Sequence, residues 1–209
     1  MSKSLWPSSD PTGELLIAAK AGSTQAVNDL LDRHREPVRK LVKMRLDRRV
    51  QQRVDVSDVV QDVMVEANAR LADYMANPSM SFHLWLRQIA WDHMIDAYRR
   101  HRGSAKRSLD REQSIMGPVA DDQSTMEMII QLRDPELTPA AAAAQSEIAK
   151  RVEATINELD PNDREIIMMR HFEHLSNQEV ADVLGLKPPA ASMRYLRAVR
   201  RLRELLEGL

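Results

Sequence analysis

A glycine and a pair of prolines fix how the C-terminal part of this chain can fold. Residues 177–184 have the apolar spacing of a short helix, and Gly185 follows where a left-handed residue ends such a helix. Pro188 and Pro189 come shortly after it and suit the first turn of a new helix, where no amide donor is needed. Two helices joined by so short a turn predict a helix-turn-helix.

The second of these helices has an apolar side and a basic side. The apolar side is formed by Ala191, Tyr195, Ala198, Leu202 and Leu205. The basic side is formed by Arg194, Arg197 and Arg201, with Ser192 and Met193 near the N-terminal end. In a helix-turn-helix this end enters the major groove of DNA, where arginine contacts phosphates or guanine edges. The alternative is a surface helix with a solvated basic face.

Basic residues gather in two blocks, although the whole chain has a formal net charge of −1. Residues 186–203 contain six lysines or arginines and no acid, and residues 97–111 contain six with one acid. Residues 112–136, between the two blocks, contain six acids and one arginine. Anion binding depends on local patches rather than on the average charge. Both basic blocks are therefore candidate surfaces for nucleic acid.

Composition favours helices and excludes several classes of site. Glycine is scarce (6 residues) and aromatic residues make up 4% of the chain. The absence of cysteine excludes disulfides, iron–sulfur clusters and thiol nucleophiles. The glycines are scattered singly, so we expect no phosphate-binding loop and no enzyme built on one. No signal-peptide pattern and no apolar run near the ~20 residues of a membrane span are found, so we expect a cytoplasmic protein.

Residues 10–102 predict an N-terminal helical domain. Apolar residues recur at helical spacing between Leu15 and Val42. A second helix follows in DVSDVVQDVMVEANARLADY, with Ser57 as its expected cap. A third lies in SFHLWLRQIAWDHMIDAYRRHR and ends near Gly103. The side chains expected to face inward from it are Phe82, Trp85, Leu86, Ile89, Met94 and Ile95.

The rest of the chain predicts a linker and a second helical domain. Residues 103–139 combine several Xaa-Pro pairs with weak periodicity, which is typical of a linker. Residues 140–209 predict four helices, the last two forming the helix-turn-helix. The expected fold class is therefore all-α, with two small helical domains joined by a flexible linker. Expected markers of helix starts in the second domain are Pro139, Asp160 with Pro161, and a capping box of Ser176 with Glu179.

Three segments, in this order along the chain, carry the motifs of a known family. They are DVSDVVQDVMVEANARL, FHLWLRQIAWDHMIDAYRRHR and LDPNDREIIMMRHFEHLSNQEVADVLGLKPPAASMRYLRAVRRLRELL. Together they resemble the extracytoplasmic-function (ECF) sigma factors of bacterial RNA polymerase, over about residues 14–102 and 145–207. The resemblance implies an initiation subunit that binds core RNA polymerase and promoter DNA. It also makes an anti-sigma protein a candidate partner.

The resemblance implies a different promoter element for each domain. The N-terminal domain would bind the clamp helices of the largest polymerase subunit and melt the minus-ten element, and the C-terminal domain would read the minus-thirty-five element. By position, the polymerase-docking residues are Asp58, Gln61 and Asp62. The minus-ten residues are Arg87, Trp91, Asp92, His93, Asp96, Arg99 and Arg100. The minus-thirty-five residues are Ser192, Arg194, Arg197 and Arg201.

Several of these residues have a second interpretation. Opening a duplex needs cations and a surface on which an unstacked base can stack, and Trp91 beside Arg87, Arg99 and Arg100 would supply both. Trp91 is equally compatible with core packing. The last two arginines also suit a solvated helix end, where cations complement the helix dipole. For the docking aspartates, the alternative is simple solvation.

Two positions depart from the family pattern. Asp92 stands where the family usually has asparagine. A carboxylate repels phosphate but accepts a hydrogen bond from a cytosine amino group or pairs with arginine, so the minus-ten base preference is open. At the start of the reading helix, PPAAS replaces the usual Gly-Thr-Val-Lys. The loss of those polar side chains leaves the minus-thirty-five preference open as well.

Other functions are less well supported by the sequence. The clusters HFEH (His171, Glu173, His174) and DHMID (Asp92, His93, Asp96) hold metal-ligand types, but neither has the HExxH form, so we expect structural histidines and no metal or cofactor. The main alternative is a helix-turn-helix regulator that binds duplex DNA as a dimer without core polymerase. A further one is a scaffold that sequesters another regulator.

The acidic segment between the basic blocks generates a prediction. It is positioned to fold over one of the two basic domains and to lower the DNA affinity of the free protein. Deleting residues 121–136 should then raise the affinity for DNA at low salt, measured by fluorescence anisotropy. An unchanged affinity would reject this role of the segment.

Overall fold

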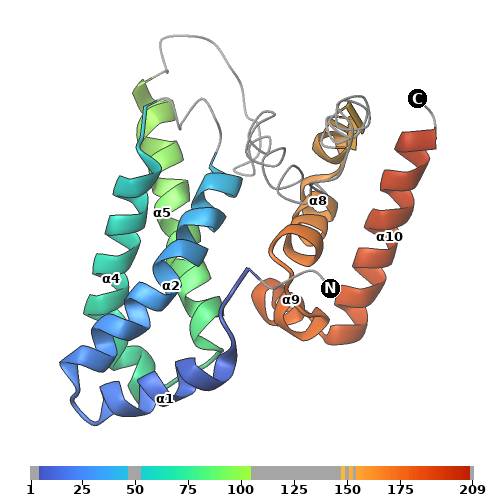
Figure 1. The fold of residues 1–209 in the computed structure, drawn as a ribbon. Coiled ribbons are helices and arrows are strands. Elements are labelled where there is room, and N and C mark those ends of the chain that lie inside the picture. Colours follow the sequence, from blue (N-terminus) through green and yellow to red (C-terminus); the bar gives the residue numbers. More distant parts are fainter. Residues whose placement is uncertain (1–4, 47–52, 105–146, 149–150, 153, 208–209) are drawn as a thin grey trace, which may run out of the picture. The chain divides into compact units, whose positions relative to one another are not determined.

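The computed structural model describes residues 5–46, 53–104, 147–148, 151–152 and 154–207. Every regular element in these ranges is a helix. The chain forms two compact units, residues 1–112 and 113–209 (Figure 1). The expected all-α, two-domain fold class is thus confirmed. The predicted linker and the start of the helix expected at Pro139 lie outside the described residues, and the extents of the predicted domains stay predictions.

The described residues of unit 1 form four helices. They are α1 (Ser9–Lys20), α2 (Thr24–Arg45), α4 (Val56–Ala76) and α5 (Phe82–Ser104). Three of them, α2, α4 and α5, pack side by side in pairs, and α1 lies across one end against α2 and α4 (Figure 1). The first apolar stretch is divided at Gly22, whose φ of 95° only glycine adopts at low cost. Ser23 then caps α2 by accepting a hydrogen bond from the Ala26 amide.

The start of α4 corrects one prediction. Ser57 does not cap this helix, because Asp55 is the N-cap and its carboxylate accepts a hydrogen bond from the Ser57 amide at 2.7 Å. Both residue types favour helix starts, and a carboxylate also complements the positive end of the helix dipole. Asp55, two positions before Ser57, therefore sets the start of α4.

An aromatic cluster joins α2, α4 and α5 in the core of unit 1. Phe82 contacts His34, Tyr74 and Trp85 at ring-centroid distances of 4.8, 5.6 and 5.4 Å. Tyr74 stacks on Trp85 at 4.7 Å and donates its hydroxyl proton to the Met80 carbonyl at 2.9 Å. Burial raises the pKa of Tyr74. The expected inward positions of α5 are buried apart from Ile95, which is partly exposed.

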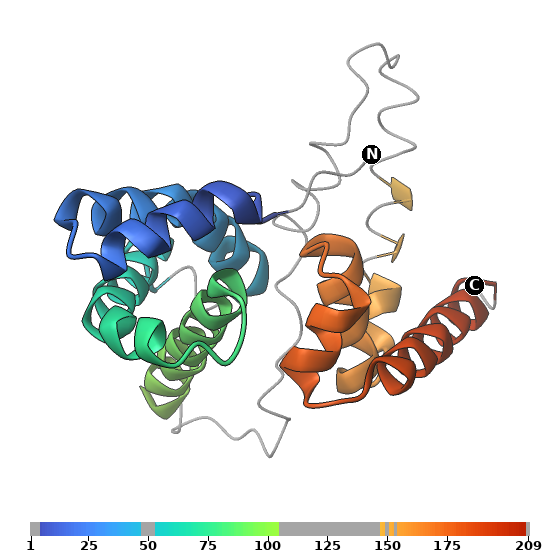
Figure 2. The same cartoon turned by 90° about the horizontal axis from the view of Figure 1, so that it is seen from below.

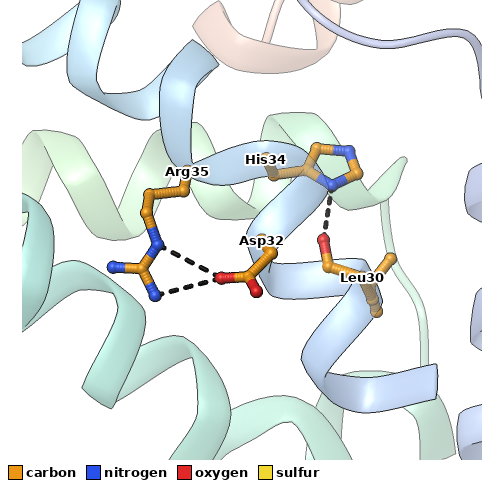
Figure 3. Close-up of polar contacts among 4 residues, drawn as sticks. All are labelled: Leu30, Asp32, His34 and Arg35. Atoms are coloured by element: carbon orange, nitrogen blue, oxygen red, sulfur yellow. Dashed lines mark hydrogen bonds and ion pairs between the residues drawn. The ribbon is translucent and has the colours of Figure 1, made fainter. Parts of the chain in front are cut away.

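His34 is a titratable group inside this cluster. Its residue is 1% exposed, and Nδ1 lies 2.9 Å from the Leu30 carbonyl oxygen (Figure 3). Because a carbonyl only accepts, Nδ1 carries the proton of the neutral ring. Desolvation by burial lowers the pKa of His34 to about 4, and the charge of Arg33 adds to the shift while the hydrogen bond to Leu30 opposes it. Asp32 and Arg35 of the same turn point away from the ring and pair with each other at 3.2 Å (Figure 3).

Unit 2 ends in the predicted helix-turn-helix. After a helical stretch at 154–158 come α8 (Pro161–Ile167), the π-helix η1 (Met168–Phe172), α9 (Asn177–Leu184) and α10 (Pro188–Glu207). α10 packs against α8 and α9 and runs along one edge of the unit (Figures 1 and 2).

Within the described residues of unit 2, the predicted start and stop signals are confirmed. Asp160 caps α8 with Pro161 in its first turn, and Ser176 with Glu179 forms the capping box of α9. Gly185 is left-handed at φ 62°. The amide of Leu186 donates to the Ala181 carbonyl at 2.8 Å, and that of Gly185 to Asp182 at 3.3 Å. This is a Schellman closure of α9, which turns the chain directly into α10.

The buried histidine predicts a pH dependence of stability in unit 1. Between pH 6.5 and about 4 the unfolded chain protonates His34 while the folded chain does not, so this residue makes stability fall as the pH falls. In His34→Gln that contribution disappears, and the loss of unfolding free energy across this window should be smaller by up to about 3 kcal/mol. All three tryptophans lie in unit 1, so tryptophan fluorescence during urea unfolding follows this unit alone.

His171→Gln, in unit 2, is the matched control and should leave the fluorescence-detected transition unchanged at every pH. Equal pH slopes for the wild type and His34→Gln would show that the folded unit already binds a proton at His34.

Candidate nucleic-acid interface

α10 presents its cations to solvent. Ala191 and Ala198 are fully buried and place that side of the helix against the rest of unit 2. Arg197, Arg200 and Arg201 are exposed, and Ser192 and Arg194 are partly exposed. The predicted basic face is therefore available for contact with phosphates. Among the residues that the structure describes, Arg194, Arg197 and Arg200 have no ion-pair partner within 4 Å.

The preceding elements hold the start of α10 in place. Asn177, the first residue of α9, donates its side-chain amide to the Pro188 carbonyl at 2.9 Å. Tyr195, one of the predicted inward residues, lies against the end of η1. Its hydroxyl is 2.9 Å from His171 Nε2, and the Arg170 guanidinium lies 5.5 Å from its ring centroid. These contacts give His171, the first histidine of HFEH, a structural role.

The end of η1 is shaped by the same residues. Arg170 donates to the Leu175 carbonyl at 2.6 Å, and His174 takes a positive φ of 55°, which is rare outside glycine. Burial, the charge of Arg170 and then that of His174 lower the pKa of His171, which favours the neutral ring beside Tyr195. The π-helix thus places Arg170 and His171 against Tyr195 of α10.

Acidic residues accompany the C-terminal half of the basic face. Arg197, Arg200 and Arg201 line an open groove together with Glu158, Asp160 and Asp163. Arg201 also pairs with Glu204 at 3.3 Å, with both side chains more than half exposed. These acids lower the local positive potential there. Lys187 and Arg194, toward the start of α10 where helix-turn-helix proteins meet the groove, lie outside this acidic lining.

α4 separates a buried apolar side from an exposed polar side. Val59, Val60, Val63 and Met64 are buried against the other helices of unit 1. The predicted docking residues Asp58, Gln61 and Asp62 are all exposed. Their spacing of three and four residues puts them on one surface of the helix. Two carboxylates at solvent suit a basic protein partner.

Trp91 lies among arginines from two helices. The Arg45 guanidinium, at the end of α2, is 5.4 Å from its ring centroid, and that of Arg87, one turn earlier on α5, is 5.5 Å away. Trp91 is partly exposed. Its exposure is thus intermediate between the two predicted possibilities, a ring packed in the core and a ring open to solvent. Both distances allow cation–π attraction.

Two of these three residues differ from what the sequence indicated. Arg87, predicted as a minus-ten contact, is only 4% exposed, so its side chain leaves little surface for a phosphate. Arg45 was not predicted at all. No spacing rule links it to Trp91, because the two are brought together only by the packing of α2 on α5.

His93 is engaged within unit 1. Its Nε2 lies 2.7 Å from Glu66 Oε2 on α4, and the other oxygen of Glu66 accepts from Arg70 at 2.8 Å. The hydrogen bond from Arg70 lowers the pKa of Glu66, and the bond from His93 adds to this, while burial opposes both. An ionised Glu66 therefore ties α4 to α5 through His93.

The remaining predicted minus-ten residues are exposed on the last turns of α5. Asp92, Asp96, Arg99 and Arg100 all reach solvent. Asp96 pairs with Arg99 at 3.7 Å, and its carbonyl accepts from Arg100 Nε at 3.3 Å. Asp96 thus contacts one guanidinium nitrogen of each arginine, and both arginine residues remain exposed.

Other kinds of site were sought in the same ranges. Within the described part of the chain, no three His, Cys, Asp or Glu side chains come together as a metal site. In that part, too, none of the helices combines the length and the apolar character of a membrane span.

Comparison with known proteins agrees with this arrangement. Residues 30–104, within unit 1, match the family described as Sigma-70 region 2, and residues 149–202, within unit 2, match Sigma-70, region 4. The RNA polymerase sigma factor CnrH of Cupriavidus metallidurans is 35% identical over 159 residues, which cover 74% of each chain. The ECF RNA polymerase sigma-E factor of Haemophilus influenzae is 25% identical over 194 residues. The aligned region covers 93% of this chain and 92% of the Haemophilus protein.

A solved structure extends the likeness to the fold. The structure of CnrH in complex with the cytosolic domain of CnrY superposes with a TM-score of 0.56 at 26% identity, covering 95% of this chain and 99% of CnrH. The region 2 match falls on the helices that carry the exposed acidic residues of α4 and Trp91, and the region 4 match on the basic helix-turn-helix. The chain therefore belongs to the ECF sigma factors, the regulators that direct RNA polymerase to its promoters.

Proposed function

We propose that the two units divide the promoter between them. Unit 1 docks on core RNA polymerase through α4 and holds the minus-ten element through α5, and unit 2 reads the minus-thirty-five element with α10. The observation that carries this division is the pairing of an exposed acidic surface on α4 with an exposed basic surface on α10, on separate compact units. An acidic surface suits a protein partner, whereas a basic one suits phosphates.

Docking rests on Asp58, Gln61 and Asp62. The two carboxylates steer α4 toward a basic surface of the polymerase, and Gln61 supplies a donor and an acceptor between them. The hydrogen bond between Glu66 and His93 lies one turn further along the same helix and links it to α5. In this arrangement the docking helix and the DNA-binding helix move as one piece.

At the minus-ten element, Trp91 is the stacking surface for a base that leaves the duplex. Arg45 and Arg87 hold the ring and add positive charge beside it. Arg87 acts through Trp91 as a positioning residue, because its own side chain is buried. Arg99 and Arg100 hold the phosphates, and Asp92 is placed to accept from a cytosine amino group. Asp96 contacts both arginines, Arg99 through its carboxylate and Arg100 through its backbone carbonyl.

At the minus-thirty-five element, α10 enters the major groove with its first turns. Ser192 and Arg194 lie nearest to the base edges, and Arg197 and Arg201 follow toward the phosphates. The chain acts in the cytoplasm with its polymerase and carries no catalytic group of its own. CnrH is solved with the cytosolic domain of a second protein bound, and we expect an anti-sigma protein to restrain this chain similarly.

The experiment that tests this function is transcription with purified components. Core polymerase free of other sigma factors is mixed with the full chain and a fragmented genomic template, and the transcripts are sequenced. Defined start sites that depend on the chain support the proposal. A chain that binds duplex DNA tightly as a dimer, and adds no start site to core polymerase, would instead be a self-sufficient helix-turn-helix regulator.

The docking surface gives a specific prediction. Replacing both Asp58 and Asp62 with lysine should weaken binding to core polymerase by tenfold or more, because like charges placed across an interface cost several kcal/mol. Binding is measured by fluorescence anisotropy of labelled protein. Asp29→Lys with Asp32→Lys makes the same charge change at exposed positions of α2 and is the control. Equal losses in the two variants would place the docking surface elsewhere.

Trp91 gives a second prediction. Trp91→Ala should lower the yield of melted promoter about tenfold, since stacking on an aromatic side chain contributes about 1–3 kcal/mol per base. Permanganate reactivity of the minus-ten thymines measures melting. Trp91→Phe keeps a stacking face and should recover most of the wild-type signal, while binding of either variant to core polymerase stays unchanged. Wild-type melting by Trp91→Ala would exclude the ring as the stacking surface.

A further inference from the structure

α10 exposes large apolar side chains where a recognition helix normally carries polar ones. Met193 is 58% exposed and Leu196 is 54% exposed, and Pro189 is exposed as well. These positions lie in the first half of the helix, whose first turn contains no acid. Exposed apolar side chains that cluster on one surface mark a site of interaction.

The helical spacing places these three residues at the centre of the exposed face. They follow one another at four and three residues, so they form a single stripe, which we call the apolar stripe. At 100° per residue this stripe lies opposite Ala191 and Ala198, the two fully buried alanines of α10. The stripe therefore points directly at whatever α10 contacts.

Cations flank the apolar stripe on one side. Arg194, Arg197 and Arg201 follow the next row of the helix, and Arg200 continues the stripe itself one turn beyond Leu196. A strip of apolar side chains beside arginines matches the DNA major groove, whose floor presents base edges and whose walls present phosphates. A protein partner would need a matching acidic rim, whereas DNA supplies the negative charge without exception.

The floor of the major groove offers one apolar group, the C5-methyl of thymine. From Pro189 to Leu196 the helix advances about 10 Å, at about 1.5 Å per residue. That length corresponds to roughly three base pairs at about 3.4 Å each. A few neighbouring thymines are thus within reach of the apolar stripe.

We propose that the apolar stripe reads thymine methyl groups in the minus-thirty-five element, with Met193 and Leu196 as specificity-determining residues. This inference rests on the proposed role of α10 in the major groove. Arg197 and Arg201 hold the backbone and set the register, and the two apolar side chains distinguish thymine from the other bases. The segment PPAAS lacks the usual polar reading groups. Its small and apolar side chains then leave room for thymine methyl groups in the major groove.

The experiment removes the methyl groups and nothing else. The full chain with core polymerase first selects DNA from a library with a randomised upstream element. The selected element is then synthesised with deoxyuridine in place of individual thymidines, since uracil pairs as thymine does and lacks only the C5-methyl. Wild-type affinity should fall about fourfold for each contacted methyl that is lost, the value of one buried methyl group.

Protein variants complete the cycle. Met193→Ala and Leu196→Ala should each abolish the uracil penalty at a particular position, because the penalty exists only where both partners are present. Both side chains are exposed, and alanine is a strong helix former, so the fold is retained. Arg197→Ala is the control, and it should weaken thymine and uracil DNA equally.

Three results would overturn the inference, each with a different consequence. A selected element whose binding is insensitive to uracil at every position overturns the methyl reading alone. Weaker binding of the Met193 and Leu196 variants to core polymerase, together with that insensitivity, assigns the apolar stripe to a protein contact. Failure to select any upstream sequence, while polymerase binding is retained, removes the proposed role of α10 and the inference with it.

Discussion

The burial of Ala191 and Ala198 determines what unit 2 can offer to DNA. Small side chains let α10 approach the rest of the unit closely, and both residues are fully buried. Because a helix repeats every 3.6 residues, fixing this side also fixes the side that faces solvent. The Schellman closure at Gly185 and the bond from Asn177 to the Pro188 carbonyl set the direction in which the helix leaves. The exposed face of α10 is therefore a consequence of packing, and a larger residue at either alanine would rotate or displace it.

In unit 1, some residues that pack the helices together also lie beside the predicted DNA contacts. Arg87 is almost fully buried on the helix that carries the predicted DNA contacts, and His34 sits neutral among aromatic rings. Buried polar groups of this kind cost stability unless they are partnered, so they restrict how the helices can pack. Arg45 of α2 lies beside Trp91 of α5, and Glu66 of α4 pairs with His93 of α5, so these two contacts near the predicted DNA-binding residues also join two helices. Stability and the proposed DNA binding of unit 1 rest partly on the same residues.

The helix boundaries of unit 2 were predictable because their signals are local. A capping box, a glycine after the last apolar position and prolines at the next helix start act within a few residues. At α4 two capping residues stood two positions apart, and the pattern selected Ser57 instead of Asp55. The burial of Arg87, the approach of Arg45 to Trp91 and the bond between His93 and Glu66 depend on how helices distant in sequence pack. Helical spacing identifies a face of α5, but it does not say which neighbour meets that face.

The near-zero net charge has a physical role in this division of labour. Acids on α4 and beside the C-terminal half of α10 offset the charge of the arginines. The free chain should therefore bind DNA of arbitrary sequence more weakly than its basic blocks alone would. In the proposed arrangement, docking of α4 on the polymerase would bring α5 and α10 to one promoter, and the second DNA contact would then form at a high effective concentration. Two modest interfaces can in this way give strong and selective binding only in the assembled enzyme. A chain with a large positive charge would lose that dependence, because it would bind any duplex without its polymerase.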